Sequence, residues 1–556
     1  MKQIKTEKLF VFLLAGWFLL NLIQSVFTEI TNDEAYYALW GKQPAFGYFD
    51  HPPMIAWLIA AGDVLFDGNL AVRFVTVLLQ VIALPMLWSL SGSRFKDTAS
   101  VWRFFAVSAS VVMFSAYGFI STPDVPLLFF SVVFLLVYRE FLIKRNWLNT
   151  ILLALTVAAL IYSKYQSGLF LLLVVLANLR LLRYYQSWLA VLLALVLLIP
   201  HFWWHYEQGF PAFQYHLADR SSPFQWKYLL EYWPNQLAVF NPFTLVAVVW
   251  AFCSSKDKSI MTRTYRVVIA GFLLFFWTTA FRGHVEPHWT IIAAIPMIIL
   301  VIQESRNNAR LRKYVARFVY PSVALILIAR ILLITGLLPE RFGFNGKQPK
   351  FEALHEVVGQ SPVIFTGSFQ NPSLYRFFTG AKSTVVSAVA TRRTQFDLWK
   401  ADEQFHNQLV FVAGNYPGRS RIYEHNGFHF EGFFTDSLQI THHLDIHLGE
   451  TGEFADTRIQ NIPFSITNKS RHPYHFNHSV FPPVWKVLIS NDSIAEFLDV
   501  EVETQRKTAE PGETIQAHLL LNVPNHFGSE VSMKIVMETF FGLTIHTRAI
   551  HLKLSE

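Results

Sequence analysis

Two short segments near the start of the chain carry side chains that can transfer protons. The first contains the acids Asp33 and Glu34 among aromatic residues, and the second places Asp50 and His51 directly before two prolines. Aromatic neighbours exclude water from a carboxylate, which tends to raise its pKa and suits a general base. The alternatives are a solvated loop in an aromatic belt for the first pair and a helix N-cap for Asp50.

Two further charges stand at the ends of apolar runs. Asp124 follows Pro123 at the abrupt start of one run, and Lys164 follows Ser163 at the end of another. Inside a membrane an acid is costly unless it is paired or faces a water-filled cavity. We therefore expect Lys164 to have a partner, either an anionic ligand or an acid such as Asp124. The alternatives are helix N-capping by Asp124 and a lysine whose ammonium extends to the membrane surface.

Histidine and arginine gather in two later loops. They are His201, His205, His216 and Arg220 in one loop, and Arg282, His284, Glu286 and His288 in the other. Such groups can bind phosphate or a metal ion. No tight ligand spacing such as H-E-x-x-H occurs, so no metal is assigned and a divalent cation stays an alternative. The many histidines of the C-terminal part are expected to be surface or structural side chains.

The elements that must position these residues are membrane helices. Of the 556 residues, 53% are hydrophobic and 15% are charged, whereas about 25% charge is usual for a soluble domain. A spanning helix needs about 20 apolar residues, and the chain offers about eleven such runs. They cover residues 9–27, 70–90, 101–119, 125–143, 148–162, 168–182, 188–204, 236–253, 267–281, 289–302 and 315–337. A shorter run at 52–66 can re-enter the membrane or lie at its surface. With room for a hidden pair of helices, which would not change the orientation, the expected total is about 11–13 spans.

Basic residues set the expected orientation of these helices. Lysines and arginines precede the first run and follow the second, fourth, sixth, eighth and tenth runs, and such residues favour the cytoplasmic side. We therefore expect a cytoplasmic N-terminus, and an outer face that carries both acidic segments, Lys164 and the C-terminal tail. The first run has no cleavage site after it, so it is predicted to be a retained helix. The net charge of +7 suits anionic lipid headgroups rather than nucleic acid.

The C-terminal tail is soluble by composition. Residues 339–443 combine short apolar runs with a helical pattern at 395–405, which predicts a small α/β region. Residues 444–556 predict a β-sandwich with a turn at 510–513. Its expected strands cover residues 461–467, 484–490, 500–506, 514–523 and 531–538. Together with a transmembrane domain at 1–338, this gives three predicted domains, and the single cysteine, Cys253, excludes an intramolecular disulfide.

The membrane part resembles the bacterial membrane glycosyltransferases of family 39, relatives of the dolichyl-phosphate-mannose protein mannosyltransferases and of the lipid A aminoarabinose transferases. The resemblance covers about residues 9–337. It is carried, in the family's order, by Asp33-Glu34-Ala35-Tyr36-Tyr37, Gly47-Tyr48-Phe49-Asp50-His51-Pro52-Pro53, Thr122-Pro123-Asp124-Val125-Pro126-Leu127, Ser163-Lys164-Tyr165 and Val285-Glu286-Pro287-His288-Trp289.

The resemblance implies the multi-helix fold called GT-C and transfer of a sugar from a polyprenyl-phosphate carrier on the outer face of a bacterial cytoplasmic membrane. It implies that Asp33 is the catalytic base, that Glu34 supports it, and that Asp50 and His51 lie near the donor phosphate or a metal. Aminoarabinose transferases tend to have Glu-Lys at the latter position, and the last motif usually has asparagine in place of His288. The acceptor, a glycolipid, lipid A or a protein, is therefore left open.

The chemistry of a lipid-linked sugar agrees with this implication. The acceptor hydroxyl must lose a proton as it attacks the anomeric carbon, and Asp33 can take it. The leaving phosphate needs cationic groups, and the expected substrate-binding residues are Asp50, His51, Asp124, Lys164, Arg220, Arg282, His284, Glu286 and His288. One base and an in-line leaving group predict inversion at the anomeric carbon.

Two other classes of protein fit the sequence less well. A lipid or sugar transporter or flippase is expected to show internal repeats and charges near the bilayer midplane, and neither pattern occurs in the sequence. A receptor with a sensor tail would not require acids in several separate loops. We therefore predict a mostly α-helical membrane glycosyltransferase with a soluble C-terminal α/β and β-sandwich region.

Overall fold

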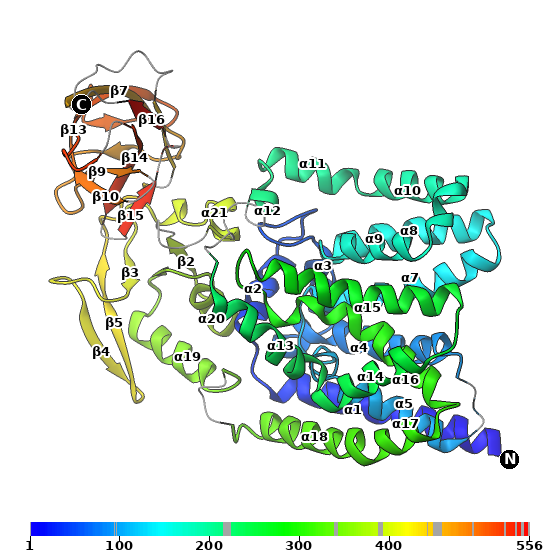
Figure 1. Ribbon diagram of the computed structural model, residues 1–556. Helices are drawn as coiled ribbons and strands as arrows, with labels where there is room; N and C mark the ends of the chain where they lie inside the picture. Colours follow the sequence, from blue (N-terminus) through cyan, green and yellow to red (C-terminus); the bar gives the residue numbers. More distant parts are fainter. Residues whose placement is uncertain are drawn as a thin grey trace. The chain divides into compact units, whose positions relative to one another are not determined.

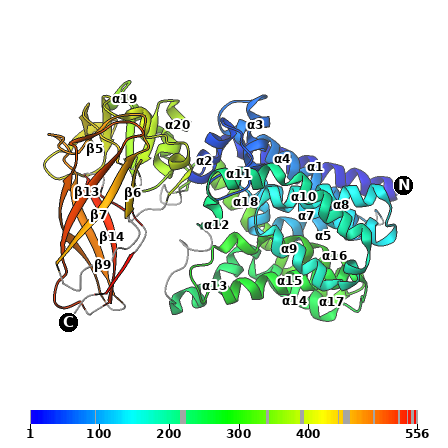
Figure 2. The ribbon, with the colours of Figure 1, turned by 90° about the horizontal axis from the view of Figure 1, so that it is seen from above.

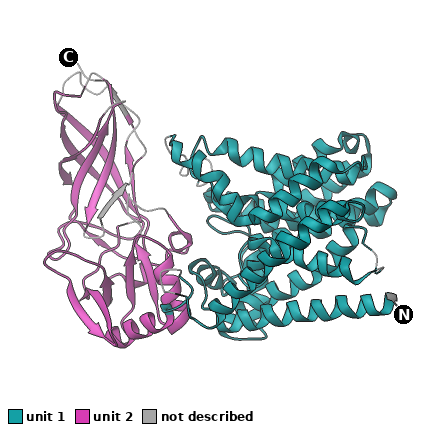
Figure 3. Ribbon diagram, turned by 60° about the horizontal axis from the view of Figure 1, so that its bottom comes forward, with its two compact units in different colours: residues 1–347 teal, residues 348–556 magenta. Residues whose placement is uncertain are grey.

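The protein forms two compact units, Met1–Lys347 and Gln348–Glu556 (Figures 1 and 3). A computed structural model describes residues 2–93, 95, 97–214, 224–338, 343–386, 393–441, 443–448, 459–491, 494–527, 530–539, 542–545, 547 and 550–553. The first unit is helical and holds every predicted site residue. The second unit is rich in strands.

The helices of the first unit follow the apolar runs of the sequence. They are α1 (Lys2–Phe27), α2 (Asn32–Gly41), α3 (Met54–Asp63), α4 (Gly68–Leu90), α5 (Thr98–Ser110), α6 (Val112–Ala116), α7 (Asp124–Ile143), α8 (Trp147–Ser163), α9 (Ser167–Ala177), α10 (Tyr185–Leu197), α11 (Ile199–Glu207), α12 (Pro211–Gln214), α13 (Trp226–Phe240), α14 (Pro242–Ser254), α15 (Ile260–Thr279), α16 (Ala294–Ser305), α17 (Ala309–Tyr314) and α18 (Tyr320–Ile334). Two 3-10 helices cover Leu179–Arg183 and Pro287–Ala293, and a π-helical turn at Val315–Val319 joins α17 to α18.

Among the described residues, six helices are long and apolar enough to cross a membrane, or up to eight if each of two bent helix pairs is one span. The expected total of about 11–13 spans is not reached by unbroken helices because several apolar runs are interrupted. The run at 101–119 is divided between α5 and α6, where Val111 is extended. The run at 236–253 bends by 92° between α13 and α14, at Asn241, whose φ is +69°.

The helices of the first unit pack against one another (Figures 1 and 2). Their buried apolar side chains form a large cluster. Helix α1 contacts α4, α5 and α18, and α8 contacts α7, α9 and α10. A polar network ties α18 to α1. In this network Arg330 donates to the side-chain oxygens of Gln24 and Asn21 at 2.8 and 2.7 Å, and its guanidinium lies 4.8 Å from the ring centre of Phe119. These contacts satisfy a cation that would otherwise be costly in a membrane helix.

The first half of the second unit is the predicted α/β region. Its five-stranded sheet has the order β2-β1-β3-β5-β4, in which β1 pairs in parallel with β2 and β3, and β5 is antiparallel to β3 and β4. Its helices are α19 (Lys347–Val358), whose first residue still belongs to the first unit, α20 (Gln370–Thr379) and α21 (Gln395–Leu398). Its strands are β1 (Val363–Thr366), β2 (Ser383–Val386), β3 (Val410–Ala413), β4 (Arg421–His425) and β5 (Phe428–Thr435). The single helix predicted at 395–405 is wrong, because Lys400 has a φ of +48° and separates α21 from a 3-10 turn at Glu403–Phe405.

In the described residues, the second half has two larger antiparallel sheets and a small one. One large sheet has the order β10-β9-β14-β15, with β16 also on β14, the other has the order β11-β13-β7-β6, and β12 pairs with β8 in the small sheet. The strands are β6 (Leu444–Leu448), β7 (Ile459–Asn468), β8 (Tyr474–His475), β9 (Val484–Ser490), β10 (Ala495–Asp499), β11 (Glu501–Thr504), β12 (Thr508–Ala509), β13 (Thr514–Asn522), β14 (Glu530–Thr539), β15 (Gly542–Ile545) and β16 (Ile550–Lys553). All five predicted strands are confirmed, because alternate side chains of β7, β9 and β13 are buried in one core.

Gly62 allows a close crossing of α3 and α4, and we expect alanine there to destabilise the helical unit. A Cβ atom at this position would lie 2.0 Å from the backbone oxygen of Ala71, so the helices would have to separate. We expect Gly62→Ala to lower the free energy of unfolding by about 1–3 kcal/mol, measured by unfolding in detergent. Gly16→Ala is the control, because a Cβ at this exposed position of α1 meets nothing within 4 Å. An equal effect of both substitutions would contradict the close crossing.

Candidate active site

Helix α2 holds the first acidic pair and begins at a capping box. Thr31 is the N-cap, its side chain accepts from the amide of Glu34, and the Glu34 carboxylate accepts from the amide of Thr31 at 3.0 Å. This reciprocal arrangement fixes the first turn of the helix. Asp33 lies in that turn and is exposed, whereas Glu34 is fully buried. The segment is therefore the start of a helix rather than a loop. Glu34 is removed from solvent, whereas Asp33 stays solvated.

Glu34 is held by the guanidinium of Arg73 on α4. Arg73 Nε and Nη2 each lie 2.7 Å from a different oxygen of the Glu34 carboxylate, and both side chains are fully buried. The amide of Ser121 donates to the same carboxylate at 2.8 Å. A forked arginine–carboxylate pair fixes orientation as well as charge, so Glu34 joins α2, α4 and the segment before α7. The predicted support of Asp33 by Glu34 stays a prediction, and the two residues share this first turn.

The Asp50–His51 segment packs against α2. Tyr48 stacks on Trp40 with ring centres 4.4 Å apart, and the Tyr48 hydroxyl bonds to the backbone at Trp40, Gln43 and Ala45. Burial raises the pKa of Tyr48, so this hydroxyl stays protonated. Asp50 is buried, and the N-cap of α3 is Pro53, with no side-chain cap. The N-cap alternative for Asp50 is therefore wrong.

Asp124 and Lys164 form the predicted pair. The Lys164 ammonium donates to both oxygens of Asp124 at 2.7 and 2.8 Å, and both side chains are almost completely buried. Tyr117 donates to the same carboxylate at 3.2 Å, and His288 Nε2 lies 3.9 Å from it. The N-cap of α7 is Pro123, without a side-chain cap. Both alternatives, N-capping by Asp124 and extension of Lys164 to the membrane surface, are therefore wrong.

The histidines of α11 turn inward. His201 Nδ1 lies 2.6 Å from the backbone oxygen of Phe46, and His205 Nε2 lies 2.8 Å from the hydroxyl of Tyr165. Burial, with a smaller contribution from the charge of Asp50, raises the pKa of Tyr165. Its phenol therefore stays protonated and can donate to His205. Two other predicted residues of this loop, His216 and Arg220, lie outside the described residues.

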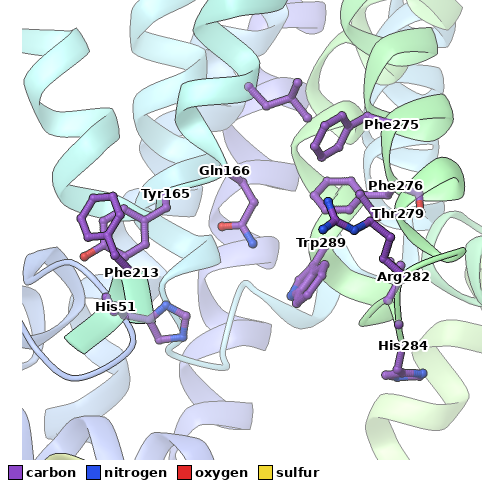
Figure 4. A pocket seen from close by; sticks show the side chains of 14 residues that line it. His51, Tyr165, Gln166, Phe213, Phe275, Phe276, Thr279, Arg282, His284 and Trp289 are labelled. Carbon is purple, nitrogen blue, oxygen red and sulfur yellow. Dashed lines mark hydrogen bonds between the residues drawn. The ribbon is translucent and has the colours of Figure 1, made fainter. Parts of the chain in front are cut away.

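A cavity of about 630 Å³ lies beside these groups (Figure 4). Its lining residues are His51, Tyr165, Gln166, Leu169, Ala212, Phe213, Phe275, Phe276, Thr279, Arg282, Gly283, His284, Val285 and Trp289. Tyr165 and Phe276 stand on opposite sides of it, and Phe275 lies towards one end while His51 and His284 lie towards the other (Figure 4). The cavity is thus aromatic along much of its wall and polar at one end.

The loop after α15 supplies the cationic part of this wall. Arg282 follows α15 and extends its guanidinium towards the cavity (Figure 4). His284 lines the same wall, with Nε2 3.8 Å from the Glu286 carboxylate. Within the described part of the chain, no three His, Cys, Asp or Glu side chains are grouped so that they could hold a metal ion. The arrangement can therefore bind an anion through Arg282 with histidine nearby.

Several of the predicted residues lie close together around Asp124. Its carboxylate accepts from Lys164 and Tyr117 and lies near His288, and His51 lines the cavity beside them. The sequence analysis assigned no role in the site to three residues that contact it: Arg73, Tyr117 and Tyr165. Arg73 had a signal, because an arginine inside an apolar run requires a partner. The partners of the two tyrosines follow only from the fold.

Breaking the Asp124–Lys164 pair is expected to destabilise the helical unit. Lys164→Met leaves the Asp124 carboxylate buried without its cation, which costs about 3–5 kcal/mol, measured by unfolding in detergent. The double variant Asp124→Asn/Lys164→Met removes both charges and is expected to recover much of this loss. Lys227→Met is the control, because Lys227 and Glu231 form an exposed pair worth at most about 0.5 kcal/mol. A Lys164→Met protein as stable as the control would contradict the burial of the pair.

Known proteins share parts of this chain. Residues 50–204 match the family described as dolichyl-phosphate-mannose-protein mannosyltransferase. The lipid A galacturonosyltransferase RgtD of Rhizobium johnstonii is 25% identical over 304 residues, which make up 50% of this chain and 60% of that protein. The chain thus spans less than two thirds of the length of this relative.

Solved structures share the fold. ArnT from Cupriavidus metallidurans in the apo state superposes with a TM-score of 0.56 at 12% identity, over 76% of this chain and 97% of that chain. The structure of the same protein bound to undecaprenyl phosphate gives a TM-score of 0.52 at 13% identity, with the same coverage. The match over residues 50–204 agrees with the resemblance seen in the sequence, and the chain shares the fold of these solved structures.

Proposed function

We propose that this protein transfers a sugar from a polyprenyl-phosphate carrier to an acceptor on the outer face of the bacterial cytoplasmic membrane. The observation that carries the proposal is the cavity, which combines aromatic walls with a polar end at Arg282, His284 and His51. A lipid-linked sugar phosphate has the same division between an apolar chain and an anionic head. The matched family and the structural relative bound to undecaprenyl phosphate support this donor class.

Arg282 is the group best placed to hold the donor phosphate. Its guanidinium is fixed in charge and presents several donors in a plane, which suits a phosphate that gains charge as the sugar leaves. His51 and His284 line the same cavity. Lys164 is engaged by both oxygens of Asp124, so in this arrangement it stabilises the site rather than offering a free cation. Arg220 keeps its expected phosphate-binding role only as a prediction.

Asp33 is the proposed general base. It is exposed at the first turn of a helix whose start is fixed by the capping box, and an accessible carboxylate can meet an acceptor hydroxyl. As this hydroxyl attacks the anomeric carbon, its proton passes to Asp33, the bond from that carbon to the phosphate oxygen breaks, and the polyprenyl phosphate leaves. One such displacement inverts the anomeric carbon. The relative named for lipid A favours a glycolipid acceptor over a protein.

Replacement of Asp33 by asparagine is expected to abolish most of the transfer. Asparagine keeps the shape of the side chain but cannot accept the proton, so kcat should fall by about 10²–10⁴-fold. Purified protein would be given radiolabelled polyprenyl-phosphate sugars and a membrane glycolipid or protein extract, and the label on each acceptor would be counted. Asp67→Asn is the matched control, because Asp67 is exposed and makes no capping bond. Full sugar transfer by the Asp33→Asn variant would contradict the assignment of Asp33 as the base.

Arg282→Gln is expected to weaken binding of the donor. Loss of a charged hydrogen bond of about 1.5–3 kcal/mol corresponds to a rise of about 10- to 100-fold in KM for the lipid-linked sugar. KM would be measured with one donor at a saturating acceptor concentration. Arg263→Gln serves as the control, since Arg263 is an exposed residue in the first turn of α15, at the end opposite Arg282. An unchanged KM for the donor would remove Arg282 from the phosphate site.

A further inference from the structure

The segment between α1 and α2 is held by two cations from distant parts of the sequence. Arg73 donates to the backbone oxygens of Thr28 and Glu29 at 2.6 and 3.0 Å. Lys347, the last residue of the helical unit, donates its ammonium to the backbone oxygen of Ile30 at 2.7 Å. Three consecutive carbonyl groups are therefore each bonded to a cation directly before the helix that carries Asp33.

Lys347 makes a second contact with this segment. Its backbone amide donates to the Glu29 carboxylate at 3.0 Å, so side chain and main chain of one residue hold two neighbouring residues. Ile30 is fully buried and Lys347 is half-buried. Burial lowers the pKa of Lys347, and the carboxylates of Glu29 and Glu34 partly offset this effect. The ammonium is thus enclosed by the segment that it holds.

The contacts continue without a break to the proposed base. Ile30 precedes Thr31, the N-cap of α2, whose amide and side chain are both bonded to Glu34. A shift of the Ile30 carbonyl therefore moves Thr31, and with it the first turn in which Asp33 lies. Arg73 restrains this turn from α4, and Lys347 restrains it from the opposite end of the unit's sequence.

We infer that Lys347 is a positioning residue for Asp33: by holding the Ile30 carbonyl, it sets where the base meets the acceptor hydroxyl. This inference rests on the proposed function. Misplacement of a reacting group by about 1 Å can cost about 10²-fold in rate. Lys347 does not line the donor cavity, so the cost is expected in kcat and not in KM for the donor.

The kinetic test compares Lys347→Met, Lys347→Arg and the control Lys350→Met, in which the replaced lysine is exposed. We expect Lys347→Met to lower kcat by roughly 10- to 100-fold with KM for the donor within about twofold. Arginine should restore much of the rate because it keeps a cationic donor. When Asp33 is already replaced by asparagine, adding Lys347→Met should lower kcat no further, since both changes act through one group. Equal kcat in Lys347→Met and Lys350→Met, or full additivity with Asp33→Asn, overturns the inference.

Hydrogen exchange tests the same inference without an activity assay. In the full-length protein, the amides of Thr31 and Glu34 are expected to exchange faster in Lys347→Met than in the unaltered chain or in Lys350→Met. Unchanged exchange of these amides overturns the inference whatever the kinetics. A chain that transfers no sugar from any donor refutes the proposed function alone, because the exchange result still decides whether Lys347 restrains α2. Faster exchange with unchanged kcat also overturns the positioning role.

Discussion

The geometry of the site depends on one ion pair that is completely removed from solvent. Arg73 and Glu34 join α4 to the first turn of α2, and the same carboxylate accepts from the amides of Thr31 and Ser121. Burying both charges is costly, and it is repaid only when every donor and acceptor has a partner. The arginine meets this condition by using its remaining donors on the backbone oxygens at the end of α1. Asp33 can therefore face solvent while its neighbour is fixed.

Asp124 and Lys164 form a second buried ion pair, at the start of α7. Its carboxylate also accepts a hydrogen bond from Tyr117 and lies close to His288, so the lysine neutralises the acid while polar groups from other segments surround it. In a low-dielectric surrounding each such charge is tolerated only with its partner present. The two ion pairs thus explain how several acids and bases can lie near one cavity without requiring solvent around all of them.

Much of this arrangement could be predicted from the sequence, because residues that are energetically unfavourable in apolar surroundings are recognisable by their position. Lys164 and Asp124 could be identified because a charge is unfavourable beside an apolar run. Strand β9 begins and ends at the predicted residues, and its side chains alternate between core and solvent. Hydropathy does not detect the breaks at Val111 and Asn241, so the runs that contain them are not single unbroken helices. The role of Lys347 could not be predicted, since its partner is a backbone carbonyl, and every residue has one.

The cavity wall has a consequence for the order of events in biosynthesis. Its residues come from the loop before α3, from α9 and α12, and finally from α15 and the 3-10 helix at Pro287–Ala293. A chain leaves the ribosome from its N-terminus, so the earliest part of the wall waits in the bilayer until Trp289 has been inserted. Half-made chains consequently lack part of this wall, and the cavity is complete only when nearly all of the helical unit has been made.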